Sequence, residues 1–252
     1  MMLAQEPARW SLDVPGRPAV LLSLFFLNTS MQRPANFDSV SLDGLLGDWI
    51  GALQEFSVEA IAILGPDPFG APQDRNVVAV HPPKVMDAAR ALARSQEFGA
   101  AWRDSDASLV AWRHIAKSDR LDSSQWPALW RADGFQTLVR VGFSLPAGRA
   151  FECFMFSRRE LSNRADAASL VWSAMNIWPL VRRAIAQARC TLSPRERECL
   201  LLAFQGLTAR ESSLRLHCAE RTVNYHLANA MGKLKVDNKL AAIQRACWFG
   251  AI

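Results

Sequence analysis

The stretch from Leu192 to Leu240 constrains the fold more than any other part of the sequence, because it defines where helices begin and end. Ser193 and Glu196 have the spacing of a capping box, in which each side chain binds the other residue's backbone N–H. Pro194 stands between them at the first helical position, where its missing N–H costs nothing. Gly206 is typical of a helix end. We therefore predict a first helix between Pro194 and Gly206.

A second capping box follows directly. Thr208 and Glu211 repeat the spacing and predict a helix that runs only to about Leu216. After a break near Cys218, a third helix carries apolar residues at helical spacing. These residues are Val223, Leu227, Ala230 and Leu234. Two short helices, a tight turn and a longer third helix are typical of a helix-turn-helix, whose last helix lies in the DNA major groove.

The exposed face of the third helix predicts how DNA is read. Arginine and asparagine match the edges of guanine and adenine, and Arg221 and Asn224 lie opposite the apolar residues. The residues predicted to contact DNA from this helix are Arg221, Thr222, Asn224, Tyr225, Ala228 and Asn229. The residues predicted to meet phosphates near helix ends are Arg195, Thr208, Lys233 and Lys235. On periodicity alone, a small helical bundle with a solvated polar face is an equally good interpretation.

The same stretch resembles the DNA-binding domain of LuxR-type transcription regulators. The matching residues are Leu192, Arg195, Glu196, Glu198, Leu200, Gly206, Thr208, Glu211, Leu216, Thr222, Val223, His226, Asn229, Lys233, Leu234, Val236 and Asn238. The resemblance implies a regulator that binds double-stranded DNA. The chain departs from the family at Ser212 and Ser213, where Ile-Ala is usual, and at Ala219, where a serine normally caps the recognition helix. Loss of such a cap typically costs about 1 kcal/mol.

Charge and composition agree with this interpretation. The net charge is +5, and residues 191–252 hold nine Lys and Arg against five Asp and Glu, so the surplus lies where a polyanion would bind. The five cysteines show no metal-ligand spacing and indicate a reducing compartment. The apolar run Val20–Leu27 is too short to span a bilayer. We expect a cytoplasmic protein with no membrane contact.

The residues before the helix-turn-helix combine strands and helices. The expected strands are Val58–Leu64, Asn76–Val80, Thr137–Phe143, Ala150–Phe156 and a segment around Trp112, and the expected helices are Ser41–Phe56, Lys84–Trp102 and Asp166–Arg189. We predict an α+β protein, with an N-terminal α/β/α sandwich around an antiparallel sheet and a C-terminal all-α helix-turn-helix domain. The expected domains are 1–189, for sensing and dimerisation, and 190–252, for DNA binding.

The order of these elements is similar to the signal-binding domain of LuxR-type quorum-sensing regulators, which encloses an acyl-lactone. The local matches are Trp112, Gly134-Phe135, and Gly142 followed by Pro146. Upstream, that family has a Trp, a Tyr and an Asp that hold the lactone ring and amide. Counting back from Trp112 by the family's spacing places their counterparts at Lys84, Ala88 and Glu97, and only Glu97 keeps the chemistry of its counterpart. The single tyrosine of the chain is Tyr225 in the recognition helix. We therefore expect a sensor domain that lacks the usual acyl-homoserine-lactone residues.

The predicted ligand wall consists of aromatic residues and one acid. The residues are Glu97, Trp102, Trp112, Trp126 and Trp130. Tryptophans are more often core residues, and that alternative stays open for each of them. No nucleophile elbow, Gly-rich phosphate loop or cluster of paired carboxylates is visible, so we expect no enzyme, no cofactor and no metal.

The expected partners follow from this organisation. A homodimer would read an inverted-repeat operator, and the helix Asp166–Arg189 has enough apolar residues to contribute to the dimer interface, with Trp172 or Trp178 near its centre. A small apolar signal molecule is the expected ligand, and RNA polymerase is a partner if the protein is an activator. The alternative is a ligand-independent regulator whose first domain serves only dimerisation or protein interaction.

Overall fold

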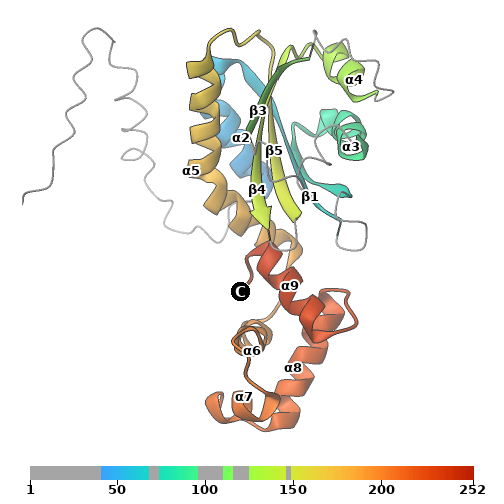
Figure 1. Ribbon diagram of the computed structural model, residues 1–252, viewed down its shortest axis with the longest axis vertical. Coiled ribbons are helices and arrows are strands. Elements are labelled where there is room, and N and C mark those ends of the chain that lie inside the picture. Colours follow the sequence, from blue (N-terminus) through green and yellow to red (C-terminus); the bar gives the residue numbers. More distant parts are fainter. Residues whose placement is uncertain (1–40, 68–73, 96–109, 116–124, 146–148) are drawn as a thin grey trace, which may run out of the picture. The chain divides into compact units, whose positions relative to one another are not determined.

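The computed structural model describes residues 41–67, 74–95, 110–115, 125–145 and 149–252 (Figure 1). Its first part contains a five-stranded sheet with the strand order β2-β1-β5-β4-β3. The strands are β1 (Val58–Pro66), β2 (Arg75–His81), β3 (Val110–His114), β4 (Thr137–Leu145) and β5 (Arg149–Ser157). All neighbouring strands run antiparallel. The predicted antiparallel sheet is therefore confirmed.

Helices cover both faces of this sheet. The helices α2 (Leu42–Ala52) and α5 (Arg164–Arg189) lie on one face, and α3 (Met86–Arg94) and α4 (Trp126–Ala132) lie on the other (Figure 1). Short 3-10 turns, η2 (Gln54–Phe56) and η3 (Pro83–Val85), join the helices to the strands. This α/β/α arrangement confirms the predicted fold class, because side chains that alternate along each strand need an apolar cover on both faces.

The face toward α2 and α5 holds the larger of the two apolar cores. Its buried residues include Leu46, Trp49, Ile61, Ile63, Phe151 and Leu170. The indole N–H of Trp49 donates to the Ser173 hydroxyl at 2.9 Å and so links the two helices. Trp178 of α5 stacks on Phe143 of β4 with ring centroids 3.9 Å apart. Trp178 is therefore part of this core.

The face toward α3 and α4 contains a cluster of aromatic rings. Its largest buried residues are Trp126, Trp130, Phe135, Phe154 and Phe156. Trp130 stacks on Phe156 with ring centroids 3.4 Å apart and planes inclined by 3°. Phe135 meets both rings edge to face. Edge and stacked contacts of this kind add stability beyond the burial of area.

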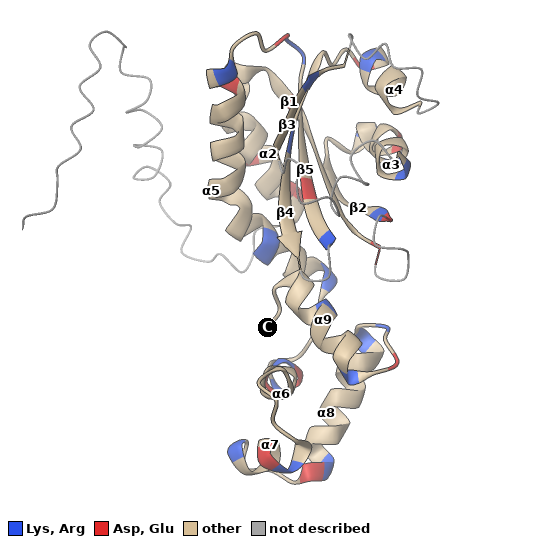
Figure 2. Ribbon diagram, in the orientation of Figure 1, with Lys and Arg blue, Asp and Glu red and all other residues tan. Residues whose placement is uncertain are grey.

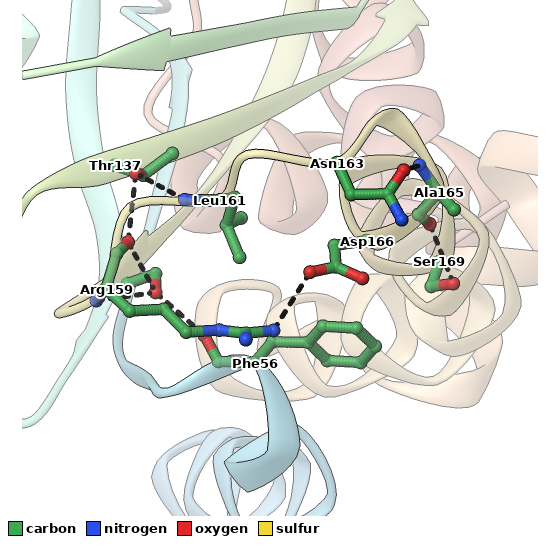
Figure 3. A network of polar contacts seen from close by, with 9 residues as sticks. Phe56, Thr137, Arg159, Leu161, Asn163, Ala165, Asp166 and Ser169 are labelled. Atoms are coloured by element: carbon green, nitrogen blue, oxygen red, sulfur yellow. Dashed lines mark hydrogen bonds and ion pairs between the residues drawn. The ribbon is translucent and has the colours of Figure 1, made fainter.

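A polar network closes the end of β5 where the chain turns toward α5 (Figure 3). The buried hydroxyl of Ser157 donates to the Phe56 carbonyl at 2.7 Å. The hydroxyl of Thr137 donates to the Arg159 carbonyl at 3.0 Å and accepts the Leu161 N–H at 3.2 Å. These bonds satisfy backbone groups that leave the sheet ladder, because buried polar groups without partners are costly.

The start of α5 is fixed by side chains of the same network. Asn163 is the N-cap, and its side-chain oxygen accepts the Ala165 N–H at 2.9 Å. Arg159 donates to Asp166 in the first turn at 3.0 Å (Figure 3). An acid near a helix N-terminus is favourable because it faces unpaired N–H groups. The sequence placed the start of this helix at Asp166, two residues later than Arg164.

Two differences from the expected elements concern the α3 and α4 side of the sheet. The helix predicted over residues 84–102 is η3 followed by α3, which ends at Arg94 because Ser95 is extended, with ψ at 144°; residues 96–102 lie outside the described residues. The helix α4 was not expected, since the spacing of apolar residues assigned no element to residues 126–132. Pro127 in its first turn is compatible with a helix start.

The C-terminal part is helical and has an apolar core of its own. Its helices are α6 (Pro194–Phe204), α7 (Ala209–Arg215), α8 (Glu220–Lys233) and α9 (Lys239–Phe249). The core includes Leu200, Val223, Ala230 and Ile243. The three predicted helices are confirmed, whereas α9 was not expected. Within the described ranges, no helix combines the length and the apolar character needed to cross a membrane.

Candidate nucleic-acid interface

Both capping boxes predicted in the C-terminal part are formed. The Ser193 hydroxyl accepts the Glu196 N–H at 3.2 Å, and the Glu196 carboxylate accepts the Ser193 N–H at 2.7 Å. In the second box, the Thr208 hydroxyl accepts the Glu211 N–H at 3.2 Å, and the Glu211 carboxylate accepts the Thr208 N–H at 2.8 Å. The bonds from Thr208 lower the pKa of the Glu211 carboxyl. The Thr208 hydroxyl is thus engaged at the start of α7, the position at which we predicted a phosphate contact.

The helix α8 separates an apolar face from a polar one, as its spacing predicts. Val223, Leu227 and Ala230 are buried. The exposed residues of the helix include Arg221, Thr222, Asn224, Tyr225 and Ala228, whereas Asn229 is half-buried. The Tyr225 ring is 62% exposed, and it meets the His226 ring edge to face with centroids 5.8 Å apart. The structure therefore brings the predicted base-reading residues together on one open surface.

Two of the predicted phosphate contacts are paired with acids inside the domain. The Lys233 ammonium donates to Glu196 at 2.8 Å, and the Glu196 side chain is 5% exposed. Arg195 pairs with Glu198 at 2.8 Å on the surface of α6. Burial opposes ionisation of Glu196, but hydrogen bonds from Lys233 and Ser193 outweigh it and lower the pKa of this carboxyl. Lys233 therefore ties the end of α8 to the start of α6.

Other exposed cations lie where a DNA backbone could reach them. Lys235 follows α8 with a positive φ of 54°, and its side chain is exposed. Arg210 and Arg215 of α7 are also exposed, although no spacing signal in the sequence singled them out. Figure 2 shows basic positions near the outer ends of α7 and α8, interspersed with acidic ones. The arrangement can offer several cations to phosphates around the polar face of α8.

The predicted ligand wall is divided between the two faces of the sheet. Trp126 and Trp130 are buried together on the face toward α3 and α4. Trp112 pairs with Val139 across β3 and β4, which places it in the core toward α2 and α5. Glu97 and Trp102 lie outside the described residues. Among the described members of the set, only Trp126 and Trp130 therefore share one surface.

Sequence reasoning missed a buried charged cluster on the face toward α3 and α4. Arg75 and Arg140 each donate to Glu152, at 2.8 and 2.6 Å. The three side chains are at most 6% exposed. An acid and an arginine at alternating positions of apolar strands were the available signal, since buried charges need partners.

The buried cysteines are poor nucleophiles. Burial raises the pKa of Cys153, Cys190, Cys199 and Cys247. A thiol reacts as the thiolate, so a raised pKa makes it inert at neutral pH. Among the residues that the structure describes, no group of three or more His, Cys, Asp or Glu residues could hold a metal ion.

The geometry of α6 to α8 defines a helix-turn-helix DNA-binding module, and a family comparison makes the assignment specific. Residues 190–246 match the family described as "Bacterial regulatory proteins, luxR family". This part of the chain is a LuxR-type helix-turn-helix domain.

Curated relatives with similar sequences are transcription regulators by name. The transcriptional activator protein LuxR of Aliivibrio fischeri is 34% identical over 126 residues, which cover 44% of this chain and 50% of that protein. The regulatory protein SdiA of Escherichia coli is 31% identical over 150 residues, which cover 55% of this chain and 60% of that protein. The chain thus matches only about half the length of these relatives.

A solved structure is similar over most of the chain. The structure of SdiA in complex with octanoyl-rac-glycerol has a TM-score of 0.51 and 17% sequence identity, and the match covers 93% of this chain and 97% of that one. At this identity the similarity concerns the fold. It confirms the combination of an α/β/α domain with a helical C-terminal domain.

Proposed function

We propose that the protein is a DNA-binding transcription regulator that acts as a homodimer. Residues 190–252 form the DNA-binding domain, and residues 1–189 form a small-molecule sensor domain that lacks the usual acyl-homoserine-lactone residues. The observation that carries the proposal is the LuxR-type helix-turn-helix, whose helix α8 exposes Arg221, Asn224 and Tyr225. The relatives named as transcription regulators support the same conclusion.

The proposed DNA contacts follow the chemistry of α8. Arg221 lies in its first turn and Asn224 one turn later, in the part of a recognition helix that enters the major groove first. Both side chains can form paired hydrogen bonds with base edges. Lys235, Arg210 and Arg215 are placed to meet phosphates, which position the helix without reading sequence.

The proposed sensor function rests on the aromatic face of the sheet. Trp126 and Trp130 of α4 are buried on this face in a layer of rings, and small-molecule sites favour apolar and aromatic linings. The SdiA structure of similar fold holds octanoyl-rac-glycerol. By analogy of fold, we infer a small, largely apolar ligand on this face of the sheet.

The proposed homodimer uses the outer face of α5. Trp172 and Met175 are 59% and 54% exposed, one turn apart on this helix. Exposed aromatic and methionine side chains are enriched at protein interfaces. A second copy of the chain is the proposed partner for this surface, and two DNA-binding domains then read an inverted repeat. If the protein is an activator, RNA polymerase is a further partner, and we place the protein in the cytoplasm.

A selection experiment tests the DNA-binding proposal. Purified full-length protein is incubated with random duplexes, and bound sequences are amplified and aligned. We expect an inverted repeat whose half-sites lie about one helical turn apart. Binding to the selected duplex should fall steeply with salt, because phosphate contacts release counterions. Enrichment of no sequence, or binding that is equal on scrambled duplexes, would refute sequence-specific regulation.

A thermal-shift experiment separates the sensor from its alternative, a ligand-independent dimerisation or protein-interaction module. The full-length protein is heated with and without small-molecule extracts of its own cells. A ligand at a hundred times its dissociation constant adds about 2.7 kcal/mol to the free energy of unfolding. A reproducible rise in Tm supports the sensor. Absence of any rise with all extract fractions favours the module.

A further inference from the structure

The buried guanidinium of Arg75 has one donor without a partner. Its Nη1 donates to Glu152 at 2.8 Å, and its Nη2 donates to the carbonyls of Leu92 and Ser95 at the end of α3. Its Nε is buried and has no hydrogen-bond partner. The Arg75 side chain is 6% exposed, so bulk water does not reach this N–H. Buried donors in folded proteins are almost always paired, and an exception needs an explanation.

A second unpaired donor lies beside the first. The hydroxyl oxygen of Ser95 is buried without a hydrogen-bond partner, whereas the carbonyl of the same residue accepts from Arg75. Because its carbonyl accepts from Arg75, the residue that carries this second free group lies against the guanidinium. Both free groups, Arg75 Nε–H and Ser95 O–H, can donate, and an arginine can never accept. An acceptor group placed between them would satisfy both, and none of the described residues forms such a bond.

The surroundings of these donors belong to the proposed ligand face. The strand register places Arg75 opposite Pro66, on the same face as Leu64, Val77 and Glu152. Leu64 and Leu92 are fully buried there in the aromatic core. Glu152 already binds two guanidiniums, Arg75 and Arg140. The free donors thus lie at the edge of an apolar layer, next to a carboxylate that is fully engaged.

We propose that this face binds an apolar small molecule through a carboxylate, which Arg75 Nε and Ser95 Oγ hold. A carboxylate has two acceptor oxygens, and its bonds to a guanidinium are charge-assisted and short. An ammonium group offers only donors, so it cannot pair with the Arg75 Nε–H and leaves that donor unsatisfied, even where the Ser95 hydroxyl accepts from it. A neutral alcohol can accept but brings no charge. The proposal rests on the proposed sensor function and names the chemical class of its ligand.

Three probes with the same alkyl chain test the head group. Octanoate, octanol and octylammonium are titrated into the full-length protein at neutral pH, and binding is measured by calorimetry and thermal shift. We expect octanoate to bind at least about tenfold more tightly than octanol, because hydrogen bonds to a charged group are stronger than neutral ones. Octylammonium should bind more weakly than both.

Removal of the Ser95 hydroxyl distinguishes a ligand contact from a structural contact, because it should lower octanoate affinity without lowering stability. Ser95→Ala removes an unpaired buried group, so the unliganded protein should be as stable as the wild type or more stable. Octanoate affinity should fall about tenfold in this variant, and octanol affinity should change less. Trp112→Phe is the matched control, because it removes the unpaired indole N–H of Trp112 on the opposite face of the sheet. It should leave the affinities for all three probes unchanged.

The outcomes separate this proposal from the sensor function itself. Equal binding of the three probes, or equal octanoate affinity in Ser95→Ala and the wild type, overturns carboxylate recognition but leaves an apolar sensor intact. Absence of octanoate binding together with stabilisation by a cell extract also overturns it and retains the sensor. Absence of stabilisation by either refutes both. Octanoate selectivity that Ser95→Ala abolishes and Trp112→Phe preserves supports the proposal.

Discussion

At the scale of single residues, the exposed side chains around α8 fall into two groups, those suited to base edges and those suited to phosphates. Arg221 and Asn224 are exposed on the polar face and offer paired donors and acceptors to base edges. Lys235 is exposed beyond the end of the helix and offers only a charge. Lys233, which the sequence grouped with Lys235, is paired with Glu196. Residue type alone therefore does not separate a phosphate contact from a structural ion pair.

The first prediction concerns base reading. Asn224→Ala or Arg221→Ala should cost about 1–3 kcal/mol on the selected operator and much less on scrambled DNA. Lys235→Ala should weaken binding to both duplexes alike and flatten the salt dependence. Fluorescence anisotropy at two salt concentrations measures both effects. Equal losses on both duplexes for Asn224→Ala and Arg221→Ala would mean that another face of α8 enters the groove.

The second prediction concerns the ion pair of Glu196. Because its pKa is lowered in the folded protein, Glu196 contributes stability above its unfolded pKa of about 4.3 and loses it as the pH falls through the folded value. Between about pH 5 and about pH 3, urea unfolding should show a larger loss of free energy for the wild type than for Glu196→Gln. Asp237→Asn, an exposed control, should behave like the wild type. Parallel curves for Glu196→Gln and the wild type would contradict this role.

At the scale of elements, the helices of the C-terminal domain differ in whether a side chain caps their N-terminus. The helices α6, α7 and α9 begin with hydrogen-bonded side-chain caps, at Ser193, Thr208 and Asn238. The N-cap residue of the recognition helix α8 is Ala219, whose side chain makes no capping hydrogen bond. Ala219 nevertheless has the extended backbone of a cap residue, with φ at −76° and ψ at 147°. The position is therefore shaped for a hydroxyl that the sequence does not supply.

The third prediction follows from this missing cap. Ala219→Ser should raise the free energy of unfolding of the C-terminal domain by about 1 kcal/mol, since the new hydroxyl can accept a free N–H of the first turn. Urea unfolding followed by circular dichroism measures the change. Ala228→Ser, an exposed substitution in the middle of α8, is the control and should be neutral or slightly destabilising. A destabilised Ala219→Ser protein would show that the helix start differs from the one described.

At the scale of the whole molecule, the two tryptophans of α5 have different roles. Trp178 is part of the core and stacks on Phe143, whereas Trp172 is 59% exposed. The sequence offered either residue as the centre of a dimer interface. The structure makes Trp172 the better candidate, because an exposed aromatic side chain is free to meet a second copy.

The fourth prediction separates association from folding. Trp172→Ala should leave the Tm of the monomer nearly unchanged and weaken the dimer by about 2 kcal/mol or more. Trp178→Ala should lower the free energy of unfolding by about 3 kcal/mol, at the lower end of the range for an aromatic core side chain, because Trp178 is partly buried and stacks on Phe143. Analytical ultracentrifugation of the wild type and Trp172→Ala, with and without operator DNA, measures association. A monomeric wild type, or a fully dimeric Trp172→Ala protein, would remove α5 from the interface.

The sequence by itself determined the elements whose signals are local. Capping boxes link residues three positions apart, and helical or alternating spacing of apolar residues repeats within a few residues, so the helices α6, α7 and α8 and all five strands could be predicted. Spacing alone left a helix-turn-helix and a small helical bundle as equal interpretations, and the family resemblance favoured the helix-turn-helix. The short helix α4, which begins at Trp126, was not predicted. It is only two turns long, and its two tryptophans are buried only because α4 packs against the sheet.

Only the tertiary structure decided which distant residues meet. Strand register placed Trp112 on one face of the sheet and Trp126 and Trp130 on the other. It also joined Arg75 to Glu152, and helix packing joined Lys233 to Glu196. These contacts span tens of residues in sequence, and a one-residue change in register would have reversed the face of every side chain in a strand. Local sequence patterns do not determine which face of the sheet a side chain occupies, because that depends on packing against elements that are distant in sequence.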